Sequence, residues 1–163
     1  MKEIVTKIKG LGLNLIRVGV NEKDKNIYEC SVYAEHEADL ITMDISWDGK
    51  YIVTTSDDGT VKVWDVNSWS LVEMYKIERD VVEAICMSPD FKYIVGNTLG
   101  TLEKGRIYRW ERGTGVSEIY RGFNGGVRDV AVALGGSYIF GCGISSDSRK
   151  LSSYYDHTIR IWR

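Results

Sequence analysis

The sequence predicts an all-β protein built from repeated, antiparallel four-stranded sheets. Three observations support this fold class. Short segments with alternating apolar residues are separated by turn signals such as WDG at 47–49 and DDG at 57–59. A similar order of segments recurs along the chain. Apolar residues with helical spacing are nearly absent, while Val, Ile, Thr and Tyr dominate the ordered segments.

The clearest unit is LITMDISWDGKYIVTTSDDGTVKVWDV at 40–66, which predicts three strands and two tight hairpins, and 71–77 adds a fourth strand. The same order recurs at 81–87, 93–96, 106–110 and 117–121, and again at 127–133, 138–141 and 158–162. Segments 3–6, 15–20 and 27–33 resemble the last three strands of a preceding sheet. The prediction is about 14 strands in four sheets within one array over 1–163, with boundaries near 34–39, 78–80 and 123–126.

Each round of the repeat ends in a similar strand, VKVWD, RIYRW or IRIWR. The tryptophans of these strands are Trp64, Trp110 and Trp162, which are 46 and 52 residues apart. This spacing is close to that expected when each repeat forms one four-stranded sheet.

Residues 36–65 resemble the repeat unit of the WD-repeat β-propeller family. The match rests on His36, Ser56, Asp58 and Trp64, together with the turn at 48–49 and the final Trp-Asp pair. The resemblance implies that these four side chains form a buried hydrogen-bonded network. In that network the carboxylate accepts from the histidine and from turn amides, while histidine and serine connect to the indole N–H.

The later rounds depart from this pattern. Ile77 and Phe123 stand where the family has histidine, and the third round carries an insertion at 145–155. The structural network expected over the three rounds comprises His36, Ser56, Asp58, Trp64, Trp110, Asp156 and Trp162.

Four sheets form an incomplete ring, because propellers of this family commonly close with seven blades. The unpaired edge and the apolar faces of the end blades then need cover. A second copy, another protein supplying blades, a strained four-bladed closure and truncation from a longer chain are all open. The sequence stops at a third strand, which favours assembly or truncation, and we expect a homo-oligomer first.

The charges are unevenly distributed along the chain. Residues 36–100 carry 12 acidic and 5 basic residues, whereas residues 101–163 carry 6 acidic and 10 basic residues. Opposite charges at the two ends favour head-to-tail contact between copies, or they simply reflect solvated strand edges.

The composition disfavours several functions. The net charge of −2 and pI near 5.7 argue against binding to nucleic acid or to an anionic membrane. No apolar run is long enough for a membrane helix and the N-terminus does not resemble a secretion signal, so a cytoplasmic protein is expected. Three cysteines without close spacing predict neither disulfides nor a zinc site, and we expect no metal and no cofactor.

The sequence offers little for catalysis. His36 matches the structural histidine of the repeat, and His157 falls in an expected Asp-x-Thr hairpin turn. The pair Asp57-Asp58 is typical of a hairpin turn. An enzyme or cofactor-binding propeller with a site in its central channel remains the alternative, but the positions available there are only Asp39, Asp80 and Arg128.

Protein binding is the favoured function, since a propeller presents short loops on two rigid faces. The expected role is therefore a non-catalytic protein–protein interaction scaffold. A purely structural role for a decayed or truncated array is a further possibility. The candidate partner-binding residues on the first loop face are Glu37, Asp39, Arg79 and Asp80, with Arg149, Lys150, Tyr154 and Tyr155 of the insertion. On the other face Trp47 and Trp69 suggest an aromatic patch, or pack locally.

Overall fold

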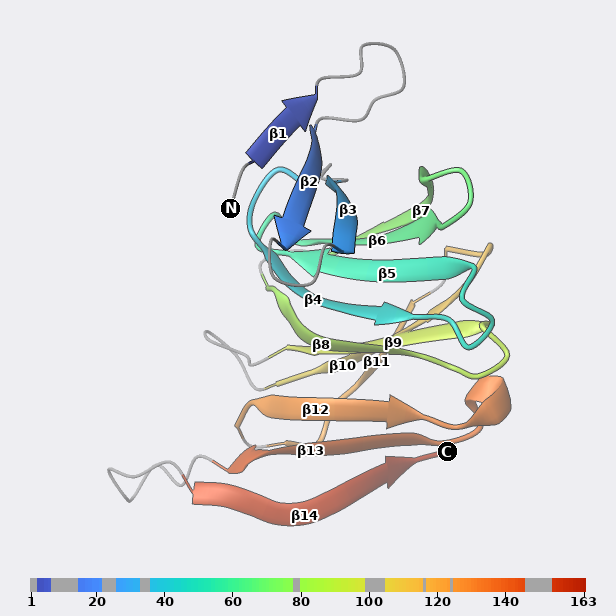
Figure 1. Ribbon diagram of the computed structural model, residues 1–163. Coiled ribbons are helices and arrows are strands. Elements are labelled where there is room, and N and C mark those ends of the chain that lie inside the picture. The colour runs from blue at the N-terminus through green and yellow to red at the C-terminus, as the bar shows by residue number, and fades with distance from the viewer. Residues whose placement is uncertain are drawn as a thin grey trace. The chain divides into compact units, whose positions relative to one another are not determined.

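The computed structural model describes residues 3–6, 15–21, 26–32, 36–77, 80–98, 105–115, 117–123, 125–145 and 154–163. Within these ranges, 14 strands form four antiparallel sheets of three, four, four and three strands (Figure 1). The predicted all-β, propeller-like array is confirmed. By its contacts the chain divides into two compact units, residues 1–35 and 36–163.

The first unit contains one sheet with the strand order β1-β2-β3. Its strands are β1 (Glu3–Thr6), β2 (Leu15–Asn21) and β3 (Asn26–Val32). They agree with the three segments expected ahead of the clear repeat.

The second unit contains three sheets in which each strand pairs with its neighbours in sequence. The first sheet comprises β4 (Leu40–Ile45), β5 (Tyr51–Ser56), β6 (Thr60–Asp65) and β7 (Ser70–Lys76). The second comprises β8 (Val82–Met87), β9 (Tyr93–Thr98), β10 (Ile107–Glu111) and β11 (Ser117–Tyr120). The third comprises β12 (Val127–Val132), β13 (Ile139–Ser145) and β14 (Tyr154–Trp162). We call these three sheets blades 1, 2 and 3.

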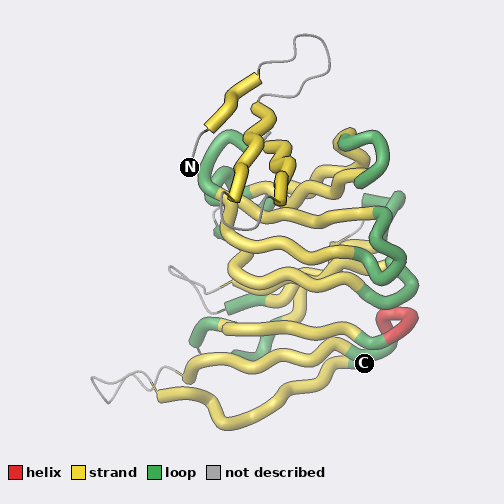
Figure 2. The backbone as a smooth tube through the Cα atoms, viewed as in Figure 1, coloured by secondary structure: helices red, strands yellow, loops and turns green. Residues whose placement is uncertain are grey.

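The blades follow one another as successive layers and do not close into a ring within 36–163 (Figure 1). β4 contacts β8, and β8 contacts β12, so the first strands of the blades line up. Figure 2 shows the turns between first and second strands gathered along one edge. Among the described residues the only helix is the 3-10 turn Leu134–Gly136 on this edge.

Local sequence explains the hairpins. Gly49 and Gly59 have φ of 69° and 75°, a left-handed conformation that glycine adopts without a steric penalty. In the β4–β5 turn the Ser46 hydroxyl donates to Asp48 at 2.8 Å and accepts from the Tyr51 N–H at 2.9 Å. These contacts give hydrogen-bond partners to polar groups of the turn that are not paired between the strands.

The apolar core lies between the blades. One buried cluster joins β5, β6 and the end of β7 to β8–β10, and includes Val53, Val63, Ile85 and Trp110. A second joins blade 2 to blade 3 around Phe123. Blade 2 contributes residues to both clusters, so it is packed against blade 1 on one face and blade 3 on the other.

The third blade corrects two expectations about the insertion. β13 and β14 extend beyond the predicted segments, and Tyr154 and Tyr155 pair with Ser145 and Ile144. These two tyrosines therefore lie in a strand, not in a loop. His157 lies in β14 at a register shift, where Ile159 pairs with Cys142 and Asp156 with Gly143, so the expected Asp-x-Thr hairpin turn is a β-bulge.

Candidate functional site

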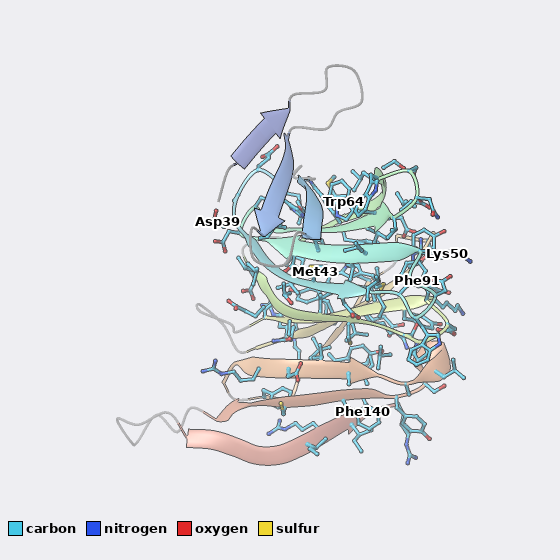
Figure 3. The ribbon with its side chains drawn as sticks, viewed as in Figure 1. Asp39, Met43, Lys50, Trp64, Phe91 and Phe140 are labelled. Carbon is cyan, nitrogen blue, oxygen red and sulfur yellow. The ribbon has the colours of Figure 1, made fainter. Side chains whose placement is uncertain are left out.

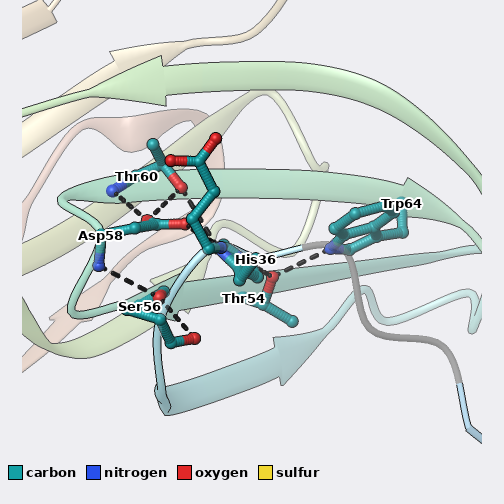
Figure 4. Close-up of polar contacts among 8 residues, drawn as sticks. His36, Thr54, Ser56, Asp58, Thr60 and Trp64 are labelled. Atoms are coloured by element: carbon teal, nitrogen blue, oxygen red, sulfur yellow. Dashed lines mark hydrogen bonds and ion pairs between the residues drawn. The ribbon is translucent and has the colours of Figure 1, made fainter.

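The loop between β5 and β6 is held by a chain of polar side chains on blade 1 (Figure 4). His36 Nδ1 lies 3.0 Å from Asp58 Oδ2, and His36 Nε2 lies 2.7 Å from Thr54 Oγ1. Trp64 Nε1 donates to the same hydroxyl at 2.8 Å. Because an indole only donates and a carboxylate only accepts, the proton of the imidazole belongs on Nδ1 and the Thr54 hydroxyl donates to Nε2.

The expected serine link to the indole is replaced by Thr54. Ser56 instead donates to the Ala38 carbonyl at 3.1 Å and accepts from the Asp58 N–H at 3.1 Å, so it holds the turn itself. Thr54 and Ser56 are two residues apart on β5 and therefore share one face of the strand. This alternation is the signal that could have identified Thr54 from the sequence.

Asp58 is the centre of the turn. It also accepts from the Thr60 hydroxyl at 2.5 Å, from the Thr60 N–H at 2.8 Å and from the Glu37 N–H at 3.0 Å. Its side chain is 7% exposed and that of His36 is 4% exposed. Burial alone raises the pKa of Asp58, but the hydrogen bonds from Thr60, Glu37 and His36 outweigh it and hold the pKa well below its usual range.

Blades 2 and 3 replace this polar network with apolar packing. By strand register, the position of Thr54 on β5 corresponds to Gly96 on β9 and Gly141 on β13. A Cβ at Gly141 would lie 2.8 Å from Ile107 Cδ1 and 3.2 Å from Trp162. Glycine therefore leaves the space that the apolar groups fill.

The later tryptophans are packed accordingly. Trp110 is 3% exposed and its ring lies 5.6 Å from both Tyr75 and Tyr108. Trp162 lies 5.7 Å from the ring of Phe123. Asp156 has its backbone in β14, and its side chain lies outside the described residues.

Beside the network is a hollow of about 550 Å³ on the loop face between blades 1 and 2. Its lining residues are Asp57, Asp58, Gly59, Lys76, Ile77, Asp80 and Val81. Asp57 is exposed and Asp80 is half-buried. Three carboxylates against one ammonium make this hollow acidic.

The structure places the other candidate residues as follows. Glu37 and Asp39 are exposed in the segment before β4, and the Asp39 carbonyl accepts from the Asp57 N–H at 3.0 Å, which brings this segment against the acidic hollow. Arg79, Arg149 and Lys150 lie outside the described residues, as do the side chains of Tyr154 and Tyr155.

On the opposite edge Trp47 and Trp69 stand in separate turns of blade 1. Trp47 is 91% exposed, so its indole does not pack against the protein surface. Trp69 is 40% exposed and has a φ of 53°. The structure thus presents Trp47 as an open aromatic side chain.

No group of three or more His, Cys, Asp and Glu side chains among the described residues is arranged to hold a metal ion. No helix in the same ranges is long and apolar enough to cross a membrane. Cys86 and Cys142 are free thiols.

Comparison with known proteins gives relatives that are similar to part of this chain. Subunit I of eukaryotic translation initiation factor 3 from Bombyx mori is 41% identical over 61 residues, which is 37% of this chain and 18% of that protein. The target of rapamycin complex subunit LST8 from Saccharomyces cerevisiae is 38% identical over 50 residues, 31% of this chain and 16% of that protein. A putative guanine nucleotide-exchange factor of the same yeast, SED4, is 25% identical over 97 residues, 56% of this chain and 9% of that protein.

The chain thus spans less than a fifth of the length of each of these relatives. Two of them are named as subunits, one of translation initiation factor 3 and one of the target of rapamycin complex. The profile of the WD domain, G-beta repeat family matches residues 28–65 and 116–163, together just over half of the sequence. With the bladed sheets of Figure 1 and the His36–Trp64 network of Figure 4, this match shows that the chain belongs to the WD-repeat family.

Proposed function

We propose that this chain is a non-catalytic protein-interaction scaffold whose acidic loop face binds a partner segment carrying arginine or lysine side chains. The observation that supports this most is the hollow lined by Asp57, Asp58 and Asp80, with Glu37 and Asp39 exposed in the neighbouring segment. The hydrogen bonds around Asp58 fix the loop before any partner arrives. A partner therefore binds without a large loss of loop entropy.

The charge of the site favours a basic protein segment over other ligands. Nucleic acid and anionic lipid would both be repelled by these carboxylates. A reaction would need a nucleophile or base positioned together with other catalytic groups, and Asp39, Asp80 and Arg128 are too few to argue one. We accordingly propose neither an enzyme nor a cofactor site.

Several finer expectations belong to the same proposal. We propose that the chain acts in the cytoplasm and that it associates with itself. We propose the remaining candidates Arg79, Arg149, Lys150, Tyr154, Tyr155, Trp47 and Trp69 as additional contacts of a protein partner.

The test uses a short fluorescent peptide of alternating arginine and serine, and an otherwise identical peptide of alternating glutamate and serine. We expect the arginine peptide to bind more tightly. Asp57→Asn/Asp80→Asn should weaken its binding about tenfold, because each surface charge pair contributes about 0.7 kcal/mol. Fluorescence anisotropy measures both affinities.

Asp48→Asn/Asp90→Asn is the matched control, because it removes the same charge from turns on the opposite edge of the blades. Its affinity should stay within about twofold of the parent, since distant surface charges are screened. Equal binding of the two peptides, or equal loss in the two variants, would contradict the acidic loop face as the binding site.

A further inference from the structure

The first strand of each blade carries a bulge near its start, at the loop face. The residue pairing of β4, β8 and β12 shifts by one position there, and the extra residues are Ile41, Glu83 and Arg128. A bulge leaves its extra residue unpaired and re-aims its side chain. Because β8 contacts both β4 and β12, the three bulges follow one another along the same edge of the blades (Figure 1).

Two of these bulge residues are exposed and carry opposite charges. Glu83 and Arg128 are both open to solvent. Blade 2 is packed against a blade on each side, so the exposure of Glu83 shows that this position stays open inside the array and not just at an end of it. Within the described part of the chain, neither charge takes part in an ion pair.

Further arginines lie at the same edge as Arg128. Arg121 directly follows β11, where the chain turns toward β12, and it is exposed. Arg106 directly precedes β10 and is half-buried. We call Arg106, Arg121 and Arg128 the basic patch. Asp129, the carboxylate next to Arg128, accepts from the Val130 N–H at 2.9 Å, so these residues together keep a net positive charge.

The acidic hollow lies on the same loop face, one junction away. Asp80 lines it just ahead of β8, and Glu83 adds another carboxylate near the start of that strand. The division of charge follows the sequence, because residues 36–100 carry 12 acidic and 5 basic residues while 101–163 carry 6 and 10. Packed sheets lie about 10 Å apart, so an extended segment crosses from the hollow to the basic patch in about three residues.

We infer that the partner segment binds across both sites and carries both signs of charge, with arginine or lysine over the acidic hollow and glutamate or aspartate over the basic patch. The inference rests on the proposed function and adds the second half of the partner. A polyanion such as nucleic acid would meet the carboxylates of Asp80 and Glu83, and a purely basic segment would meet Arg121 and Arg128. A short segment of both signs meets opposite charge at each site.

Fluorescent peptides of equal length test this arrangement. Two separated peptides, one in each order, join an arginine–serine half to a glutamate–serine half through about three glycine or serine residues. A mixed peptide of the same composition alternates arginine and glutamate, and a further peptide is arginine–serine throughout. Fluorescence anisotropy should show that one separated peptide binds about tenfold more tightly than the mixed and arginine–serine peptides, because it forms additional surface charge pairs with the basic patch.

Arg121→Glu/Arg128→Glu reverses the charge of the basic patch. This variant should bind the arginine–serine peptide more tightly than the separated peptide, which is the opposite of the parent. Arg121→Gln/Arg128→Gln should bind the two peptides within about twofold of each other, since it removes the charge without reversing it. Thermal melts show whether each variant is folded, and the glutamine variant alone decides the matter if the glutamate variant does not fold.

Lys50→Glu/Lys92→Glu is the matched control, because it reverses two exposed charges in turns on the opposite edge of the blades. Figure 3 shows Lys50 on that edge and Asp39 on the loop edge. The control should keep the preference of the parent. Equal binding of the separated and mixed peptides by the parent, an unchanged preference in the patch variants, or the same loss in the control would each overturn the inference.

The two proposals fail in different ways. Binding of the arginine–serine peptide that Asp57→Asn/Asp80→Asn leaves unchanged contradicts the acidic hollow and hence the proposed function. If that variant does weaken binding but neither separated peptide gains over the arginine–serine peptide, the further inference alone is wrong. Tighter binding of a glutamate–serine peptide than of either separated peptide would indicate a polyanionic partner and overturn it as well.

Discussion

The ring of Phe123 packs against the Trp162 indole with 5.7 Å between centroids, where blade 1 sets His36 against Trp64 at 6.1 Å. The two pairs occupy equivalent positions, but one is apolar and the other belongs to a hydrogen-bonded chain. The equivalent position on the second strand of each blade also differs, because it is Thr54 in blade 1 and Gly141 in blade 3. A hydroxyl is needed where histidine and indole must be bridged, and a glycine where a phenyl ring fills the space.

Thr54→Val should destabilise the protein although it preserves volume. The substitution removes the hydroxyl that links Trp64 Nε1 to His36 Nε2, and so leaves two buried polar groups without this partner. We expect a loss of about 2 kcal/mol in the free energy of unfolding. Urea denaturation measures it, and Thr42→Val on β4 serves as the control with a change within about 0.5 kcal/mol.

Gly141→Ala should destabilise blade 3 through crowding. Its methyl group would lie 2.8 Å from Ile107 Cδ1 and 3.2 Å from the Trp162 indole, both closer than ordinary contact. Overpacking of this kind costs about 1–3 kcal/mol. Thermal unfolding should show a lower midpoint for Gly141→Ala than for Cys142→Ala, whose side chain is exposed. An unchanged midpoint would mean that blade 3 relaxes more readily than its packing suggests.

The sequence predicted the strands well because their signals are local. Alternation and turn residues determine where β4 to β12 begin and end, and these need no long-range information. Two features depended on tertiary structure. The bulge at His157 arises from the register between β13 and β14, and Thr54 takes its role from the position of the Trp64 indole across the strands. Neither is encoded in a short motif, although strand alternation already placed Thr54 on the face of Ser56.

Arg112→Lys should weaken the junction between blades 1 and 2. The Arg112 guanidinium pairs with Glu73 at 2.6 Å and lies 3.6 Å from the centroid of the Phe91 ring, and both charged side chains are less than one-fifth exposed. Lysine keeps the charge but loses the planar stacking, so a loss of about 1–2 kcal/mol is expected. Arg109→Lys is the control and should cost less, because its partner Glu118 is half exposed and its guanidinium lies farther from the nearest ring, 4.8 Å from the Tyr93 centroid. Equal losses in urea denaturation would contradict this difference.

Asp58→Asn should change how stability depends on pH. Hydrogen bonds hold the pKa of Asp58 below its usual range in the folded protein, so the unfolded chain binds a proton at this site first as pH falls. The ionised carboxylate therefore stabilises the fold fully above a pH of about 4, the unfolded pKa, and loses this contribution progressively as pH falls toward the folded pKa. We expect the parent to be more stable than Asp58→Asn at neutral pH, and the difference to shrink below pH of about 4. Urea denaturation of both proteins across this pH range measures the difference in stability. Asp57→Asn, which changes an exposed neighbour, is the control. A difference that does not depend on pH would show that Asp58 acts through shape rather than charge.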